Sequence, residues 1–215
     1  MAAITVLGGT GYTGGNIVRE AAKRGHDVTS FSRSVPTEPV SGVHYETGSL
    51  LDPAVRRKAL QGADVVVAAL APRGELEDQI ESLYAQLGEL AAAAGVRFGV
   101  VGGFSALRPA QGAPRFAEGG EVPPEFAAEA HAMHSVLLHL IDDAPENLQW
   151  FYASPAAKYG SYAPGEATGT YRIGGEVALF DENGESALSG ADFALAIVDE
   201  IESSTRNGQQ FSVAY

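Results

Sequence analysis

The residues with the clearest chemical meaning are glycines near the start of the chain, in the stretch ITVLGGTGYTGGNIVRE. Gly8, Gly11 and Gly14 form a G-x-x-G-x-x-G pattern between a short apolar run and an amphipathic segment. Glycines there permit a tight turn and a close backbone approach to a pyrophosphate, which the free N–H groups of the next helix then face. A glycine-rich turn that binds nothing is the alternative. The pattern predicts a dinucleotide pyrophosphate site made by Gly8, Thr10, Gly11, Tyr12, Thr13 and Gly14.

A basic residue occupies the position that normally decides which coenzyme a dinucleotide site binds. Arg33 lies nineteen positions after Gly14, between Ser32 and Ser34. An NAD site places an acidic residue there to bind the ribose 2′-hydroxyl, whereas a guanidinium with flanking hydroxyls suits a phosphate. These three residues therefore predict a 2′-phosphate site and a preference for NADP(H) over NAD(H). An ordinary surface arginine is the alternative.

Short β-rich runs alternate with helical patterns along the chain, which predicts a parallel sheet covered on both faces. The expected fold class is α/β, a Rossmann-like doubly wound sheet. One NAD(P)-binding domain is expected over residues 1–215, with the part from about 155 to 215 as a small substrate-side elaboration. The expected strands are 3–7, 27–33, 43–47, 64–70, 97–103, 148–154 and 210–215.

Apolar residues at a helical spacing predict the faces that pack on this sheet. The spacing marks four helices, with Asn183-Gly184 indicating a hairpin and Ser189 or Asp192 capping the last helix. The basic run Arg56-Arg57-Lys58 is interpreted as a solvated helix face, and Trp150 as a core residue. The positions are Ile17, Val18, Ala21 and Ala22; Ile80, Leu83, Tyr84, Leu87, Leu90 and Ala94; Phe126, Ala130, Met133, Leu137, Leu140 and Ile141; and Phe193, Ile197 and Ile201.

Ligands of such sheets bind beyond the carboxyl ends of the strands, so the residues after each strand are further candidates. Those after the third strand would border the adenine, those after the fourth the riboses, and those after the fifth the nicotinamide. Ser105 is the candidate catalytic residue, as a polar contact near the nicotinamide or the acceptor. Ordinary loops are the alternative at each position. The candidates are Ser49 and Leu50; Ala69, Leu70 and Ala71; Gly102 and Gly103; and Pro155 after the sixth strand.

The composition narrows the classes of partner. The chain has 14 Lys and Arg against 27 Asp and Glu, a formal net charge of −13, which disfavours nucleic-acid binding. It has no cysteine, which excludes thiolate chemistry and Cys-ligated zinc. His131 and His134 lie three apart on an expected helix, but without a third ligand they are interpreted as surface residues and no metal is expected. No signal peptide or membrane span is recognised, so a cytoplasmic protein is expected.

The stretches GGTGYTGGNIVREAAKRGHDVTSFSR, VVGGFSAL and SPAAKYG…TGTYRIGGE resemble the NmrA-like atypical short-chain dehydrogenase/reductases. The resemblance covers essentially the whole chain, and the nearest branch contains the NAD(P)H-flavin reductases and biliverdin-IXβ reductase. It implies a Rossmann fold, a reduced nicotinamide donor and a flavin or similar planar acceptor. It also implies a functional serine within one residue of Ser105.

Two departures from the wider family shape the functional prediction. No Tyr in the chain has Lys four positions later, so ketone or alcohol chemistry through a Tyr-x-x-x-Lys pair is not expected. The histidine that biliverdin reductase-like members carry after the sixth strand is replaced, since that stretch reads Ser154-Pro155-Ala156-Ala157. A flavin or quinone acceptor is therefore favoured over a tetrapyrrole. The loop from 152 to 165 could be a lid, with Tyr159 or Tyr162 stacking on the acceptor.

The leading prediction is an NADPH-dependent reductase that passes hydride to a flavin, a quinone or a similar planar acceptor. The alternative is a redox sensor of the NmrA kind, which binds NADP without turnover and reports to a protein partner. An isomerase or dehydratase that uses the coenzyme transiently is a third possibility. The expected oligomeric state is a monomer or a homodimer.

Overall fold

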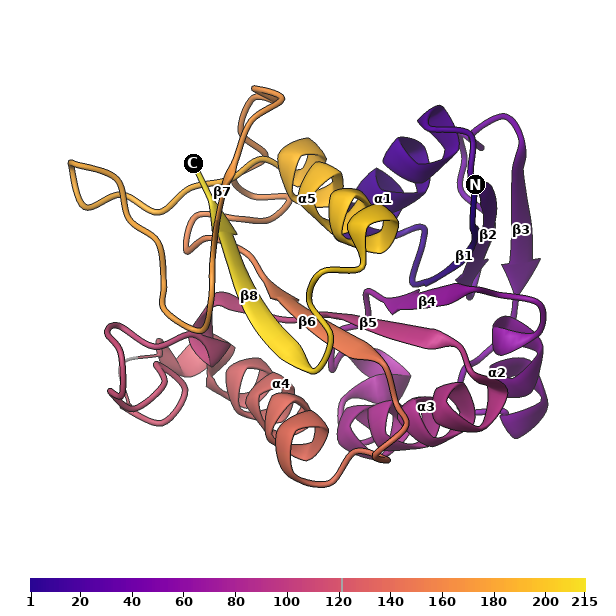
Figure 1. Cartoon of the computed structure of the whole chain (residues 1–215), viewed down its shortest axis with the longest axis horizontal. Coiled ribbons are helices and arrows are strands. Elements are labelled where there is room, and N and C mark those ends of the chain that lie inside the picture. Colours follow the sequence, from indigo (N-terminus) through magenta and orange to yellow (C-terminus); the bar gives the residue numbers. More distant parts are fainter. Residues whose placement is uncertain (121) are drawn as a thin grey trace.

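The computed structural model describes residues 1–120 and 122–215, and its strands form one mostly parallel sheet (Figure 1). The order is β3-β2-β1-β4-β5-β6-β8-β7. Neighbouring strands are parallel, except that β7 runs antiparallel to β8 at the edge. The strands are β1 (Ala3–Leu7), β2 (Asp27–Ser32), β3 (Val43–Thr47), β4 (Val65–Ala68), β5 (Arg97–Val101), β6 (Trp150–Ser154), β7 (Arg172–Gly174) and β8 (Gln209–Ala214).

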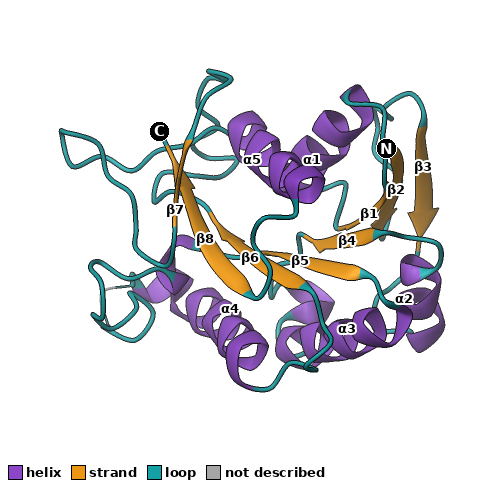
Figure 2. Ribbon diagram, in the orientation of Figure 1, coloured by secondary structure: helices purple, strands orange, loops and turns teal. Residues whose placement is uncertain are grey.

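Helices cover both faces of the sheet, as Figures 1 and 2 show. The helices α1 and α5 lie side by side on one face, and α2, α3 and α4 lie on the other. The helices are α1 (Tyr12–Lys23), α2 (Pro53–Leu60), α3 (Ile80–Ala94), α4 (Pro124–Asp142) and α5 (Gly190–Ser203), with short 3-10 turns η1 (Gly74–Leu76) and η2 (Phe104–Ala106). The predicted α/β, Rossmann-like doubly wound architecture is confirmed.

Two apolar cores follow from this layering, one on each side of the sheet. Every residue of β4 is buried, as expected for a central parallel strand that is covered on both faces. Ile17 of α1 and Ile197 of α5 pack in one core, and Leu83 of α3 and Leu137 of α4 pack in the other. Ser189 caps α5 by accepting a hydrogen bond from the Asp192 amide, so of the two predicted caps Ser189 is the observed one. Trp150 is buried, as predicted.

Several local predictions differ from the structure. The strands predicted at 27–33, 64–70, 97–103 and 148–154 are one to three residues shorter in the structure, because the end residues lie in the adjoining irregular segments. Phe126 and Ile141 were predicted to pack on the sheet, but their side chains are 52% and 50% exposed. Ile141 is rotated about 100° from the buried Leu140, and α4, at about 28 Å, is longer than the roughly 17 Å strands beneath it.

Two polar predictions were also wrong in part. Arg56 is buried rather than solvated, and its Nη1 donates to the Leu50 carbonyl at 2.7 Å. The turn at Asn183-Gly184 exists, with the Gly184 amide donating to the Asp181 carbonyl at 3.1 Å, but no strands flank it. Instead β7 pairs with β8 at the edge of the sheet, and the segment between β7 and α5 is a long loop that projects beyond this edge before it reaches α5 (Figure 1).

Within the described ranges, none of the helices combines the length and apolar character needed to cross a membrane.

Candidate coenzyme site

The glycine turn between β1 and α1 is closed by backbone packed against backbone. Gly8 has a positive φ of +80°, and the Gly11 amide donates to the Gly8 carbonyl at 2.9 Å. A Cβ atom at Gly14 would lie 2.2 Å from the Gly8 carbonyl oxygen, and one at Gly8 would lie 2.4 Å from the Ala69 carbonyl oxygen. Side chains at these positions would therefore force the turn open, so the glycines are sterically required.

The first turn of α1 has amides available for an anion. Gly11 is the N-cap and offers no side chain, and the helical bonds begin with the Gly15 amide, which donates to the Gly11 carbonyl at 2.8 Å. The amides of Tyr12, Thr13 and Gly14 precede that bond and so have no partner within the helix. Tyr12 and Thr13 are half-buried and Gly14 is buried. Three such donors at a helix N-terminus suit a pyrophosphate.

The side chains of Tyr12 and Thr13 are held by the C-terminal third of the chain. The Tyr12 hydroxyl donates to the Pro164 carbonyl at 3.3 Å and accepts from the Gly190 amide at 3.1 Å. The Thr13 Oγ1 and Tyr159 Oη atoms lie 2.8 Å apart. The segment after β6 and the start of α5 therefore fix the glycine turn from the side of the sheet that carries α1.

This packing corrects the expectation that Tyr159 stacks on an acceptor. Its ring makes edge contacts with Tyr12 and Phe193, at centroid distances of 5.6 and 4.9 Å. Burial raises the pKa of the Tyr159 hydroxyl well above its usual value, so the group stays protonated and serves as a structural hydrogen-bonding partner. Tyr162 is 75% exposed and makes no such contact with the turn.

The three polar residues at the end of β2 divide into the half-buried Ser32, which is the last residue of the strand, and the exposed Arg33 and Ser34. The Ser32 hydroxyl accepts from the Thr10 amide at 3.1 Å and donates to the Phe31 carbonyl at 2.8 Å, so it braces the glycine turn. Arg33 and Ser34 are exposed. Ser32 thus acts on the backbone, which leaves Arg33 and Ser34 as the groups open to a 2′-phosphate.

The residues after β3 and β4 lie beside this region. Ser49 is half-buried and its hydroxyl donates to Glu75 at 3.1 Å, whereas Leu50 is buried. The Leu70 amide donates weakly to the hydroxyl of Tyr84 at 3.4 Å, and Tyr84 anchors the end of β4 from α3. Ala69 touches Gly8 through its carbonyl, and Ala71 accepts from the Arg73 amide at 2.8 Å.

The ends of β5 and β6 bring the remaining candidates together. A Cβ atom at Gly102 would lie 1.9 Å from the Tyr152 ring, so only glycine leaves room for this ring next to the end of β5. Gly103 precedes η2, which carries Ser105 half-buried, and the Ser105 carbonyl accepts from the Ala117 amide at 2.8 Å. Pro155 is buried directly after β6.

An aromatic cluster beside Ser105 was not found from the sequence. Phe104 stacks on Phe116 at a centroid distance of 4.9 Å and meets Phe180 edge-on at 6.3 Å. Phe180 is 42% exposed, so the cluster borders solvent. The three residues come from separate loops with no common spacing, and only the fold unites them.

Of the two histidines predicted to lie on the surface of α4, His131 is exposed as predicted, whereas His134 differs. His134 is buried rather than on the surface as expected, and its Nε2 atom has no hydrogen-bond partner among the described residues. Burial lowers the pKa of His134, and the Glu118 carboxylate at 3.7 Å opposes that shift. The described part of the chain contains no group of three or more residues able to hold a metal ion.

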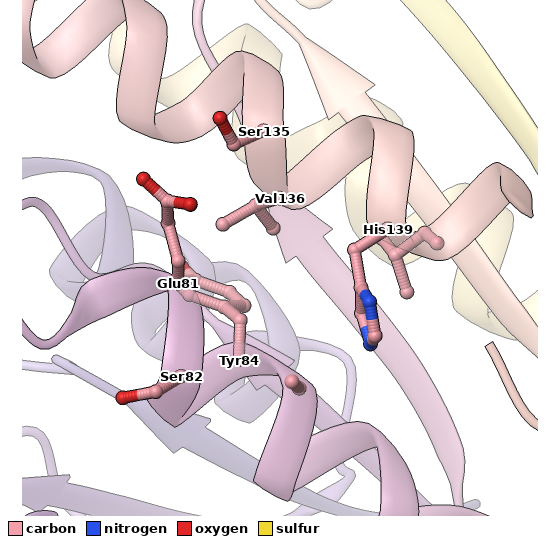
Figure 3. Close-up of a pocket in the computed structure, with 8 residues that line it drawn as sticks. Glu81, Ser82, Tyr84, Ser135, Val136 and His139 are labelled. Atoms are coloured by element: carbon pink, nitrogen blue, oxygen red, sulfur yellow. The ribbon is translucent and has the colours of Figure 1, made fainter. Parts of the chain in front are cut away.

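Two of the cavities formed by the described residues differ in how they relate to the predicted site. One of 470 Å³ lies between the first turn of α1, the segment 164–167 and the start of α5, and it includes Thr10, Gly11 and Tyr12. The other, of 240 Å³, lies between α3 and α4, where Glu81 and Tyr84 face Val136 and His139 (Figure 3). None of the predicted coenzyme residues lines this second cavity.

A glycine turn with an uncapped helix at the carboxyl edge of a doubly wound sheet defines an NAD(P)-binding Rossmann-fold protein. The chain belongs to the NAD(P)H-binding family, whose sequence profile matches residues 8–203. The predicted membership of the NmrA-like atypical short-chain dehydrogenase/reductases is thereby confirmed. Fold and family together place the chain among the NAD(P)H-dependent oxidoreductases.

Three of the similar solved structures are at least 28% identical to the chain and match its whole length. A "putative exported protein" from Burkholderia pseudomallei is 36% identical, with 100% of both chains covered and a TM-score of 0.86. A "putative NADH-flavin reductase" from Streptococcus pneumoniae TIGR4 is 30% identical, with 100% of this chain and 99% of that chain covered and a TM-score of 0.85. A "putative epimerase" from Bacteroides thetaiotaomicron is 28% identical, with 100% and 97% covered and a TM-score of 0.88.

Proposed function

We propose that this chain is an NADPH-dependent reductase that transfers hydride to a flavin or a similar planar acceptor such as a quinone. The observation that carries the proposal is the glycine turn, because it combines free amides with a backbone surface from which Cβ atoms are excluded. Both properties are needed for close contact with a pyrophosphate.

The residues fit a nicotinamide dinucleotide along the carboxyl edge of the sheet. Under this proposal, Arg33 and Ser34 hold the 2′-phosphate, Ser49 and Leu50 border the adenine, and Ser105 contacts the nicotinamide or the acceptor. Ala69, Leu70 and Ala71 line the riboses. The pyrophosphate residues are Gly8, Thr10, Gly11, Tyr12, Thr13 and Gly14, braced by Ser32, and the nicotinamide end is completed by Gly102, Gly103 and Pro155.

The chemistry asked of the protein is mainly positioning. When bound, the reduced coenzyme supplies a hydride. The chain offers no Tyr-x-x-x-Lys pair to protonate a ketone oxygen. A flavin or quinone accepts hydride at its ring system and takes its proton from solvent, so holding two planar groups in register supplies most of the rate.

The aromatic cluster of Phe104, Phe116 and Phe180 supports a planar acceptor. It adjoins Ser105 and leaves Phe180 partly exposed, as required of a ring that stacks on a ligand. Phe180 comes from the segment 155–215, which this proposal assigns to the substrate side of a single domain. The similar protein from Streptococcus pneumoniae, described as a "putative NADH-flavin reductase", supports the same acceptor class.

Phe180→Ala separates acceptor binding from coenzyme binding. We expect the KM for FMN to rise about threefold to tenfold, the size of one lost aromatic contact, while the Kd for NADP⁺ is unchanged. Ile141→Ala is the control, because it removes an equally exposed apolar side chain from the far end of α4. An unchanged KM for every acceptor tested would remove Phe180 from the acceptor site.

The direct test is a steady-state assay of the purified chain with NADPH or NADH and FMN, FAD or quinones. The proposal predicts coenzyme oxidation that saturates with the acceptor, with the higher kcat/KM for NADPH. Absence of oxidation with all of these acceptors would refute the reductase.

The missing Tyr-x-x-x-Lys pair also favours a second candidate, a redox sensor of the NmrA type that binds NADP without turning it over. This candidate predicts tight coenzyme binding by calorimetry together with no turnover over a broad acceptor panel. The two outcomes of the assay therefore discriminate between the candidates.

A further inference from the structure

The end of the sheet that holds Arg33 is also reached by the segment after β4. The strand order β3-β2-β1-β4 places β1 and β2 between β4 and β3, yet the turn η1 after β4 meets residues that follow both β2 and β3. Ser49, after β3, donates its hydroxyl hydrogen to Glu75 at 3.1 Å. The segment from 71 to 79 therefore runs across the strand ends to the proposed adenosine region.

Arg33 lies against the same turn. A Cβ atom at Gly74 would lie 3.7 Å from the Arg33 Nη1 atom, and Gly74 has a positive φ of +60°. The residue next to Gly74 is Glu75, so a guanidinium and a carboxylate border one region. Both residues are exposed, which leaves them accessible to a ligand.

These two groups favour different coenzymes. A guanidinium with hydroxyls suits a 2′-phosphate, whereas a carboxylate accepts a hydrogen bond from a ribose 2′-hydroxyl and repels a phosphate. The carboxylate also engages the Ser49 hydroxyl, whose oxygen is fixed by the Leu51 amide at 3.2 Å. That hydroxyl must leave Glu75 before it can donate to a phosphate.

We propose that Glu75 is a coenzyme-specificity residue whose effect opposes that of Arg33. Its carboxylate, which accepts a hydrogen bond from Ser49, repels the 2′-phosphate of NADP(H) and can accept a hydrogen bond from the 2′-hydroxyl of NAD(H). The inference rests on the proposed function, whose coenzyme preference it refines. Under this inference, the preference of the chain for NADP(H) over NAD(H) is weaker than it would be with Arg33 alone. The inference also means that coenzyme specificity depends on the segment after β4, which carries Glu75, as well as on Arg33 after β2.

Calorimetric titration of wild type and Glu75→Gln with 2′,5′-ADP and with 5′-AMP tests the proposal, because these probes differ only at the 2′-phosphate and need no nicotinamide site. Gln keeps an oxygen that accepts from Ser49 but removes the charge. We expect the affinity ratio of 2′,5′-ADP to 5′-AMP to rise about fivefold in Glu75→Gln, the effect of one exposed charge. The same change is expected in the ratio of NADP⁺ to NAD⁺.

Glu77→Gln is the matched control, since Glu77 is also exposed and lies at the end of the same turn. An equal rise in Glu77→Gln would mean a general effect of net charge and would overturn the inference, as would an unchanged ratio in Glu75→Gln. If wild type bound none of the four probes, the proposed function would fail instead. The two failures are therefore distinguishable.

Discussion

At Gly14 the first helix approaches the turn that precedes it more closely than any side chain permits. The distance of 2.2 Å between a Cβ atom at this position and the Gly8 carbonyl oxygen is far below van der Waals contact, and the opposing atom is backbone. Neither group can rotate away. The geometry of the turn, and with it the direction of the free amides, depends on the absence of a Cβ atom at Gly14.

Gly14→Ala is expected to lower the free energy of unfolding by about 1–3 kcal/mol, the usual cost of overpacking, and to abolish NADP⁺ binding because the amides are displaced. Thermal denaturation and calorimetry measure the two effects. Gly15→Ala is the control, since its Cβ atom would meet its nearest neighbour at 3.5 Å, an ordinary contact. Similar behaviour of the two variants would contradict the steric argument.

The Thr13–Tyr159 contact shows that a proposed coenzyme residue can depend on a distant partner. The two hydroxyls lie 146 positions apart in the chain and 2.8 Å apart in space. Tyr159→Phe keeps the ring and removes this bond, so we expect a loss of about 1 kcal/mol in stability by denaturant titration. Tyr162→Phe should have no effect, because Tyr162 is 75% exposed. Equal stabilities of Tyr159→Phe and wild type would contradict the assigned role.

At the level of elements, the start of α5 organises the loop that follows β6. The buried Asp192 carboxylate accepts from the amides of Thr168 and Gly169 at 2.8 and 2.9 Å, and from the hydroxyls of Ser189 and Tyr215 at 2.9 and 2.5 Å. It thereby ties the loop and the C-terminus to one helix end. The same loop carries Pro164, which accepts from Tyr12, so the tie extends to the glycine turn.

Asp192→Asn is expected to cost about 2–3 kcal/mol, because several hydrogen bonds lose a charged acceptor. Burial by itself would raise the pKa of Asp192, but the bonds from Tyr215, Thr168, Ser189 and Gly169 outweigh it and lower the pKa below 3.8. The folded pKa is thus below the unfolded one, so this contribution is present above about pH 4 and is lost as the pH falls further.

Unfolding of wild type and Asp192→Asn across pH 3 to 8 measures that dependence. The difference in stability should be constant near neutrality and shrink below about pH 4. A difference that persisted unchanged at low pH would show that the charge of Asp192 is not what stabilises the loop.

For the whole molecule, a buried ion pair joins the sheet to α5 at the opposite edge from the glycine turn. Arg97 begins β5, and its Nη2 atom lies 2.5 Å from Glu200 Oε1, while its Nη1 atom donates to the Glu200 carbonyl at 2.9 Å. Arg206 also donates to Glu200, at 2.9 Å. These side chains lie at the amino ends of the strands, whereas the proposed coenzyme residues lie at the carboxyl ends.

Glu200→Gln should therefore reduce stability without changing the site. We expect a loss of about 3 kcal/mol, because Arg97 would remain buried without its counter-charge, and an unchanged Kd for NADP⁺ in the folded protein. Glu46→Gln breaks the exposed pair with Lys58 and should cost less than about 1 kcal/mol. A large loss of coenzyme affinity in Glu200→Gln would contradict this separation of the two edges.

The fold could be predicted because its signals are local. Glycine spacing, apolar periodicity and strand–helix alternation each act within a few residues, and the backbone geometry of a strand or helix imposes the period. The strands β1 and β4 and most of the packing face of α3 were found in this way, although Ala94 at the end of α3 is exposed. The exposed Phe126 and the buried Arg56 were missed, because exposure depends on where each helix lies relative to the sheet.

The sequence by itself determined the doubly wound sheet, the glycine turn and the position of Arg33 after β2, since these depend on neighbours in the chain. Only the tertiary structure decided that Glu75 meets Ser49, that Tyr159 holds Thr13, and that three phenylalanines gather beside Ser105. Such contacts form when loops of irregular length converge at a sheet edge, and no periodic pattern records where an irregular loop ends in space.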